Sequence, residues 1–176
     1  MAKATSLEDR LRAIEDRLEI LNLIASHPPS ADSGADYFTR AVYTEDGVID
    51  LGGGKVASGN EKIAAMVKEP GHQAAIAGGL CHFAGLPRIE IDGDTATVTS
   101  YLQILTPHPT AEPHEVPNHG VTKGFRIHRA GANRWELVRT AAGWKIKRRT
   151  LRPLDGSEPA RELLRAGLKA FAPKAS

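Results

Sequence analysis

The feature that most constrains the fold is a long alternation of apolar and polar residues from Thr95 to Thr106. Alternation at every second residue is the pattern of a β-strand with one buried face. The preceding Asp92-Gly93-Asp94 has the turn chemistry of a β-hairpin, so Arg88 to Ile91 is expected to pair with this strand. Two more long strands are expected from Val121 to Thr140 and from Trp144 to Leu151. Together these segments predict a mostly antiparallel sheet.

The N-terminal segment has the helical period instead. Apolar residues recur at helical spacing from Leu7 to Ile24, and Ser6 with Asp9 forms a weak capping box at the start. Pro28-Pro29 is expected to end this helix, because proline lacks an amide hydrogen and biases the preceding residue away from helical geometry. The pattern predicts an amphipathic helix whose apolar side lies on the sheet.

Shorter elements are expected between this helix and the long strands. Ser30 to Gly34 is predicted to be a tight corner that directs Asp32 toward the buried side of the first helix. Short helices are expected from Tyr37 to Val42 and from Ser58 to about Lys68, the second closed by Pro70-Gly71. Short strands are expected at Val48 to Leu51, after a turn at residues 45–47, and at Leu80 to Pro87.

This order, helices first and strands grouped after them, is typical of an α+β fold. We expect a strongly curved, mostly antiparallel sheet wrapped as a cone-shaped roll around the N-terminal helix. A length of 176 residues fits one domain, which we place at residues 1–152. The tail, residues 153–176, carries a short helix from Glu158 to Phe171. That helix could cover a cavity as a lid or contact another subunit, and the lid is the interpretation we favour.

Composition restricts the class of protein. A hydrophobic content of 41% and a charged content of 25% are ordinary for a soluble globular chain. The one cysteine, Cys81, allows no internal disulfide and no zinc framework, which suits a reducing compartment. No apolar run is long enough for a membrane span or a signal core, so a cytoplasmic protein without a membrane partner is expected.

Basic residues are concentrated in the C-terminal part of the chain. Residues 101–176 carry fourteen Lys and Arg against six Asp and Glu, and Lys145 to Arg149 is the densest stretch. This stretch could be a solvated strand face or an anion site. Because no recognised nucleic-acid motif accompanies it, we expect no nucleic-acid partner. Of Arg148 and Arg149, one should face outward and the other could reach a cavity or a subunit contact.

Two histidines lie among apolar strand residues, His82 in Cys81-His82-Phe83 and His108 just after Pro107. An imidazole titrates near neutral pH, so it can take up a proton and return it within one reaction cycle. A histidine on an apolar strand is also common as a hydrogen-bonded core residue. His27, at the end of the first helix, is expected to interact with the helix C-terminus, although it could point into a cavity mouth.

A metal site is not expected. The spacings between His108, His114, His119 and His128 match no zinc or iron signature. Cys81 and His82 are adjacent on a strand and should face opposite sides, which argues against a Cys–His nucleophile.

Several blocks of the sequence resemble the SnoaL-like proteins of the nuclear transport factor 2-like superfamily. The similar blocks run in order over residues from about 10 to 152: Glu15 to Ile20, Tyr43 to Asp50, Ile89 to Ala96 and Arg139 to Ile146. The resemblance implies the cone fold described above, a cavity that works without a cofactor, and a dimer or trimer of identical subunits.

Within the superfamily the chain shows a closer resemblance to the scytalone dehydratases and the hexachlorocyclohexane dehydrochlorinases. This resemblance implies that Asp32 and His82 form a catalytic dyad in which the aspartate orients the imidazole as a base. It also implies that His108 lies across the cavity. Tyr101, Asn133, Leu51 and Phe83 are the expected substrate-binding residues. Ala31 and Leu51 stand where the dehydratases have tyrosines, so a different substrate is expected.

Two functions from different classes follow from this pattern. The first is a dehydratase-like lyase or isomerase that acts on a small hydrophobic compound, aromatic or polyketide-like. The second is a non-catalytic module of the same fold that binds a small ligand or a partner protein. An epoxide hydrolase would need an Asp–Arg–Asp trio that cannot be recognised here. Contact between Asp32 and His82 in an open apolar cavity would favour the enzyme.

Overall fold

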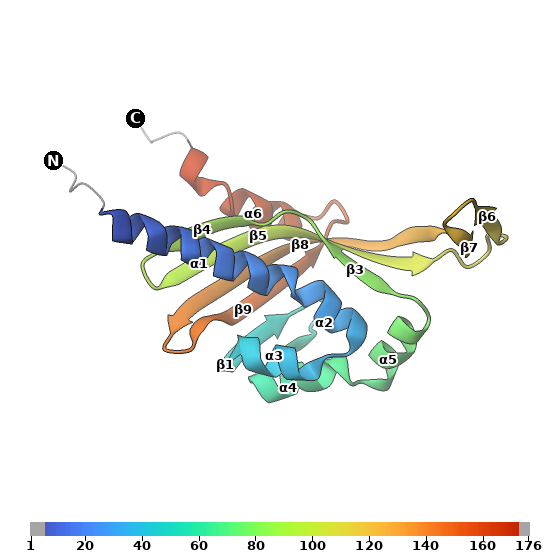
Figure 1. Cartoon of the computed structure of the whole chain (residues 1–176), viewed down its shortest axis with the longest axis horizontal. Coiled ribbons are helices and arrows are strands. Elements are labelled where there is room, and N and C mark those ends of the chain that lie inside the picture. The colour runs from blue at the N-terminus through green and yellow to red at the C-terminus, as the bar shows by residue number, and fades with distance from the viewer. Residues whose placement is uncertain (1–5, 173–176) are drawn as a thin grey trace.

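The computed structural model describes residues 6–172, and its strands are preceded and interrupted by helices (Figure 1). The helices are α1 (Leu7–Ala25), α2 (His27–Ser33), α3 (Asp36–Val42), α4 (Asn60–Val67), α5 (Pro70–Ala77), α6 (Glu158–Ala166) and the 3-10 turn η1 (Lys169–Phe171). The strands are β1 (Tyr43–Asp50), β2 (Val56–Ser58), β3 (Cys81–Ala84), β4 (Arg88–Asp92), β5 (Thr95–Pro107), β6 (His114–Val116), β7 (Gly120–Thr122), β8 (Phe125–Thr140) and β9 (Gly143–Pro153).

Seven strands form the main sheet, in the order β2-β1-β9-β8-β5-β3, with β4 also paired to β5. Every pair is antiparallel except β1 with β9. The long strand β5 pairs with β8 over its whole length, and its other edge pairs first with β4 and then with β3. This register sets His82, on the edge strand β3, opposite Ile104 of β5. The expected α+β class and mostly antiparallel sheet are confirmed.

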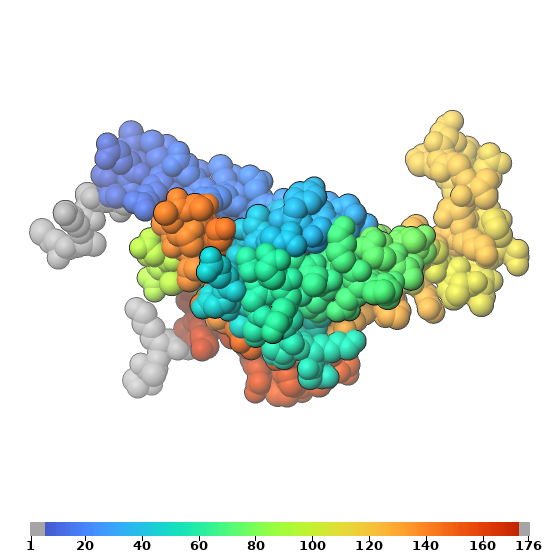
Figure 2. All heavy atoms as spheres, turned by 90° about the horizontal axis from the view of Figure 1, so that it is seen from below, coloured from blue at the N-terminus to red at the C-terminus, as the bar shows by residue number. Residues whose placement is uncertain are grey.

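Helices cover both faces of the sheet. Helix α1 lies on one face and α6 on the other, as the two perpendicular views agree (Figures 1 and 2). The main core lies between α1 and the sheet, where Ile20 and Ile24 pack with Val98, Trp135 and Leu137. Helices α2 to α5 lie together beyond the C-terminal end of α1 (Figure 1). No helix within residues 6–172 is long and apolar enough to cross a membrane.

The predicted apolar side of α1 faces the sheet only at its C-terminal end, through Leu23 and Ile24, so the prediction was wrong for most of the helix. The predicted capping box between Ser6 and Asp9 is present, but the side chains that α1 buries are Asp16, Ile20 and Ile24. Five apolar residues of the helix are 36–68% exposed: Leu7, Leu11, Ile14, Leu18 and Leu21. The reason is that the N-terminal part of α1 extends past the sheet, while its C-terminal part packs on the sheet through a different face (Figure 1).

A buried ion pair and an adjoining hydrogen bond fix α1 to strands β8 and β9. The carboxylate of Asp16 accepts hydrogen bonds from Nη1 and Nη2 of Arg139, at 2.5 and 2.6 Å. It also accepts one from Nε1 of Trp144, at 3.1 Å. The guanidinium of Arg139 lies 4.5 Å above the Trp144 ring and also bonds Asp94. These contacts lower the pKa of Asp16, the hydrogen bonds from Arg139 being the main cause.

Prolines open two helices that the sequence pattern did not predict. Pro28 and Pro29 lie in the first turn of α2, where the predicted corner stands, and Pro70 is in the first turn of α5. Proline is well tolerated there because the first amides of a helix have no intrahelical acceptor. Residues 45–47, predicted as a turn, are part of β1 and lie where its pairing with β9 is irregular.

The strand predicted from Val121 to Thr140 is interrupted after β7. Strands β6 and β7 form a small separate hairpin between β5 and β8, and β8 begins at Phe125. This hairpin extends far from the body of the protein at the end of the β5–β8 ribbon (Figures 1 and 2).

The C-terminal helix α6 packs on the sheet face opposite α1. Ala160 and Leu163 of this helix are buried against Ala132 of β8. None of the cavity-lining residues described below comes from the tail up to residue 172, so the interpretation of α6 as a lid was wrong. A role in subunit contact stays a prediction.

Candidate active site

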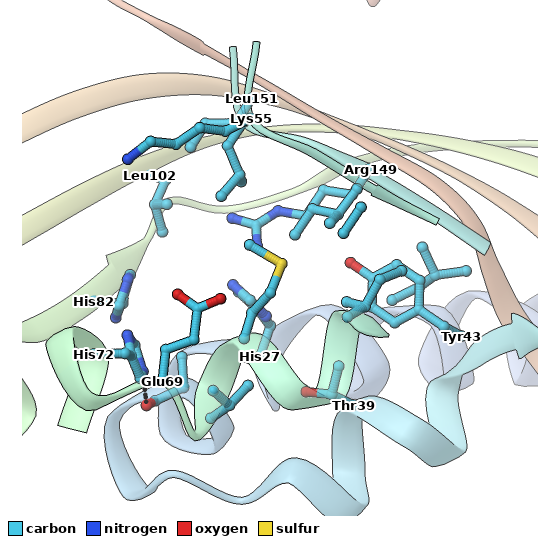
Figure 3. A pocket seen from close by; sticks show the side chains of 18 of the residues that line it. His27, Thr39, Tyr43, Lys55, Glu69, His72, His82, Leu102, Arg149 and Leu151 are labelled. Atoms are coloured by element: carbon cyan, nitrogen blue, oxygen red, sulfur yellow. Dashed lines mark hydrogen bonds between the residues drawn. The ribbon is translucent and has the colours of Figure 1, made fainter. Parts of the chain in front are cut away.

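A cavity of about 570 Å³ opens between helices α2 to α5 and the sheet. Its wall is mostly apolar, and Ala31 and Leu51 are among the lining residues. The substrate-binding role expected for Leu51 stays a prediction. The polar side chains on the wall are His27, Thr39, Tyr43, Lys55, Glu69, His72, His82, Arg129 and Arg149, most of which Figure 3 shows around the open space.

Asp32 and His82 are in direct contact at one end of this cavity. Asp32 is in the last turn of α2, and His82 is on the edge strand β3. Nδ1 of His82 lies 2.6 Å from Oδ1 of Asp32, and the backbone N–H of His82 donates to Oδ2 at 2.8 Å. The carboxylate therefore holds both the ring and the backbone of the histidine. His82 lines the cavity and Asp32 lies behind it.

The hydrogen bond to Asp32 decides which nitrogen of His82 is free. An ionised carboxylate can only accept, so Nδ1 carries the proton and Nε2 has the lone pair. Burial lowers the pKa of His82 below 6.5, while the hydrogen bond and charge of Asp32 act in the opposite direction. At neutral pH the ring is therefore an uncharged base, and its conjugate acid would be stabilised by an adjacent carboxylate.

A second imidazole at this end of the cavity, His72, was missed by the sequence analysis. It lies on α5 and donates from Nε2 to the carbonyl oxygen of Ala31, at 2.8 Å. The rings of His72 and His82 have centroids 6.3 Å apart (Figure 3). Pro70 followed by an alanine-rich segment is a helix-start signal that would have located α5 and its histidine. The pattern around Pro70-Gly71 instead predicts the end of the preceding helix.

His27 lines the cavity, which corrects the expectation that it interacts with the C-terminus of the first helix. It begins α2, and its ring packs edge-on against Trp135 at a centroid distance of 5.1 Å. Its Nε2 is buried and has no hydrogen-bond partner among the described residues. Burial, followed by the charge of Arg149, holds the pKa of His27 well below 6.5, so this imidazole is neutral at physiological pH.

Arg149 is the buried cationic group of the cavity wall, which also carries Lys55 and Arg129. Strand alternation on β9 turns Arg148 outward, where it lies 3.6 Å from Asp50, and turns Arg149 inward, where it is 3% exposed. Its guanidinium lies 4.5 Å over the ring of Trp135, and its Nε donates to Oδ1 of Asn133 at 3.2 Å. Tyr43 lies nearby, and burial raises the pKa of this phenol to about 12.

Three of the predicted site residues are not on the cavity wall, and each has a structural reason. His108 follows the end of β5, which has left the cavity by that point, and its Nδ1 accepts from the backbone N–H of Ala111. Phe83 and Tyr101 are 65% and 52% exposed on the opposite face of the sheet. Adjacent strand residues alternate in direction, so the inward neighbours His82 and Leu102 take the lining positions.

Asn133, the fourth, is on the cavity side of the sheet but lies under Arg149. It is fully buried and does not line the cavity. Its side-chain oxygen positions the guanidinium, and its Nδ2 has no partner among the described residues. Asn133 is therefore not in a position to bind a substrate directly, as the resemblance implied, and contacts the cavity-lining Arg149 instead.

Comparison with known proteins agrees with this architecture. The SnoaL-like domain family matches residues 12–150. A crystal structure of an NTF2-like protein with a cystatin-like fold from Novosphingobium aromaticivorans is 38% identical, with a TM-score of 0.80, covering 93% of this chain and 98% of that one. No curated protein matches.

Two more distant structures share the fold. A protein of Novosphingobium aromaticivorans DSM 12444 provisionally named a scytalone dehydratase is 18% identical, with a TM-score of 0.58, over 81% of this chain and 85% of that one. The hexachlorocyclohexane dehydrochlorinase LinA-type3 of Novosphingobium barchaimii LL02 is 15% identical, with a TM-score of 0.63, over 85% and 97%. From the family match and the 38% identical relative, this chain belongs to the SnoaL-like family and has the NTF2-like, cystatin-like fold.

Proposed function

We propose that this protein is a cofactor-independent acid–base enzyme, a lyase or isomerase, that removes a proton from carbon in a small hydrophobic substrate. The observation that carries the proposal is the 2.6 Å contact between Asp32 and His82 at the wall of an open, mostly apolar cavity. Two proteins of the same fold are named for eliminations, one of water and one of hydrogen chloride, which is the same class of chemistry.

In this mechanism Nε2 of His82 takes the proton from a carbon next to a carbonyl or a leaving group. The imidazolium that forms is stabilised by Asp32, which stays ionised. In an isomerase the same nitrogen returns the proton to another carbon. In a lyase it delivers the proton to the departing oxygen, or keeps it when the leaving group departs as an anion. His72, whose Nε2 is already bonded to Ala31, can orient the substrate beside His82.

The apolar wall supports a hydrophobic substrate, and it also strengthens the base. Little water competes in such a cavity, so the attraction between Asp32 and a protonated His82 is weakly screened. The alternative, a module that binds a ligand without chemistry, shares the cavity but has no need for a carboxylate aligned on both the ring and the backbone of one histidine.

Exchange of hydrogen for deuterium tests proton removal without knowledge of the product. We would incubate the protein in D2O with cyclic and aromatic ketones and follow loss of the C–H signals next to the carbonyl by proton NMR. We expect at least one compound to exchange faster with the wild-type protein than with His82→Gln. His128→Gln, which changes an exposed histidine outside the cavity, should keep the wild-type rate. Binding of these compounds with no exchange above the His82→Gln rate would favour the non-catalytic module.

A further inference from the structure

Arg149 is a buried cation without a counter-ion. Within residues 6–172 no carboxylate lies within ion-pair distance of it, whereas Arg139 and Arg152 each pair with an aspartate. A buried charge is normally paired, because removing it from water is costly. The cation–π contact with Trp135 and the hydrogen bond to Asn133 offset only part of this cost. The counter-charge is therefore to be sought in a ligand.

The free part of the guanidinium has the geometry to bind a carboxylate. Nε is occupied by Asn133, and the hydroxyl of Tyr43 lies close enough to interact with the guanidinium without forming a hydrogen bond of normal geometry. Figure 3 shows this end of the side chain reaching from the sheet into the cavity, between the imidazoles and Tyr43. Two parallel N–H donors match the two oxygens of a carboxylate, which is the arrangement that favours arginine over lysine.

Two further polar atoms on the same wall lack partners. The hydroxyl of Tyr43 and Nε2 of His27 are both buried and make no hydrogen bond with a described residue, and both side chains line the cavity. Buried polar atoms without partners are uncommon in folded proteins. Their position near Arg149 indicates that the polar end of a ligand belongs on this side of the cavity.

We propose that the substrate carries a carboxylate that pairs with Arg149, while its hydrophobic part fills the cavity and presents the reacting carbon to His82. The place of the reacting carbon rests on the proposed function; the carboxylate subsite itself does not. The assignment makes the substrate class a small hydrophobic carboxylic acid with an acidic C–H at a second position.

Ligand pairs that differ only in charge test this subsite. Calorimetry would compare cyclohexanecarboxylate with cyclohexanecarboxamide. Because hydrogen bonds to charged groups are stronger than neutral ones, we expect the carboxylate to bind wild-type protein about 10- to 100-fold more tightly. Arg149→Met should abolish the preference. Arg148→Gln, which changes the outward neighbour, should retain it.

Asn133→Asp is a second variant for the case in which the protein does not fold without Arg149, because it keeps the buried arginine. The new carboxylate would lie beside Nε of Arg149 and form an ion pair with it inside the protein. The melting temperature should therefore rise, and the preference for a carboxylate ligand should disappear. Equal affinity for acid and amide in the wild-type protein, binding of neither at millimolar concentration, or an unchanged preference in folded Arg149→Met would overturn the subsite. His82→Gln should keep the preference, so failure of the subsite and failure of proton removal can be told apart.

The exposed stripe of α1 carries a second, independent inference. Its residues follow the alternating spacing of four and three that places side chains along one seam of a two-stranded coiled coil. They are Leu7, Leu11, Ile14, Leu18 and Leu21. Asp16 and Ile20, which fix α1 to the body of the protein, lie on other faces of the helix.

The charges beside the stripe determine how a second helix would pair with it. Glu8 and Glu15 flank it on one side, and Arg10 and Arg17 on the other. In a parallel pair of identical helices Arg10 lies beside Glu15 of the second copy, whereas an antiparallel pair places like charges together. The geometry points to a dimer in which two copies of this chain pair in parallel through α1.

Sedimentation and crosslinking test the α1 dimer. We expect wild-type protein to dimerise at micromolar concentration and Ile14→Glu with Leu18→Glu to be monomeric. Leu86→Glu, a change at an exposed leucine outside α1, should remain dimeric. The single variant Arg10→Glu should weaken the dimer, and Glu15→Arg added to it should restore the affinity.

Orientation is tested in a Cys81→Ser background. Leu11→Cys should form a disulfide with itself on mild oxidation if the helices are parallel. Crosslinking only between Leu11→Cys and Leu18→Cys chains would mean antiparallel helices and would contradict the inference, as would a dimer that survives the two glutamates.

Discussion

Replacing Asp32 by asparagine is expected to lower turnover of the substrate by about a thousandfold or more, because the change reverses the tautomer of His82. In the variant the side-chain oxygen would still accept from the backbone N–H of His82. The amide NH2 group would then face Nδ1, which must become an acceptor, so the proton moves to Nε2. The nitrogen that faces the cavity then has no lone pair with which to remove a proton.

The same variant should change the pH dependence of the rate as well as its size. Asp32 raises the pKa of His82 against the larger, opposing effect of burial. Without its charge the pKa of the imidazole falls further, so the acid limb of the rate profile should move to lower pH. Asp92→Asn, at an exposed turn, is the matched control and should leave both rate and profile unchanged. An Asp32→Asn protein with a tenth or more of wild-type activity would exclude the proposed role of the dyad.

Replacing Asp16 by alanine is expected to lower the free energy of unfolding by about 3 kcal/mol, the largest loss of stability among the changes considered. The substitution removes an acceptor of three hydrogen bonds and leaves Nε1 of Trp144 buried without a partner. Arg139 would keep only its contact with Asp94. Urea unfolding followed by circular dichroism measures the change.

Asp94→Ala is the control for this prediction, because it removes the other carboxylate that Arg139 contacts. Asp94 is largely exposed, and exposed ion pairs contribute between zero and about 1 kcal/mol. A loss for Asp16→Ala no larger than that for Asp94→Ala would show that the buried pair does not anchor α1. The pKa of Asp16 is lowered in the folded protein, so its contribution is present above about pH 4 and is lost as the pH falls below the ordinary carboxyl pKa of 3.8.

The sheet could be predicted from the sequence, but what covers it could not. Alternation along β5 and the Asp92-Gly93-Asp94 turn report local geometry, and both are where they were expected. The stripe on α1 reports only that one side of a helix is apolar. It does not say whether the body of the protein or another molecule covers that side. Here the ion pair between the buried Asp16 and Arg139 of β8 determines which side of α1 faces the sheet. Most of the apolar residues of the helix are left on the exposed side.

The candidate site was predicted in part. Family resemblance placed Asp32 beside His82, and the structure brings them together, while their catalytic role stays a prediction. The spacing from His82 to His108 could not reveal that pairing of β5 with β3 ends at Leu105, beyond which the strand runs out into the hairpin ribbon. Phe83 is different, because the two-residue period of a strand already places it opposite to His82.

Trp135 gives the site a property that is useful in the laboratory. Its indole contacts both the guanidinium of Arg149 and the ring of His27, and these two side chains border the cavity. The second tryptophan of the chain, Trp144, is beside Arg139 in the anchor of α1. Light emitted by Trp135 should thus respond to whatever occupies the cavity, and a Trp144→Phe protein would report it from a single fluorophore. Compound collections can be screened by emission alone, with no coloured product and no prior guess at the reaction.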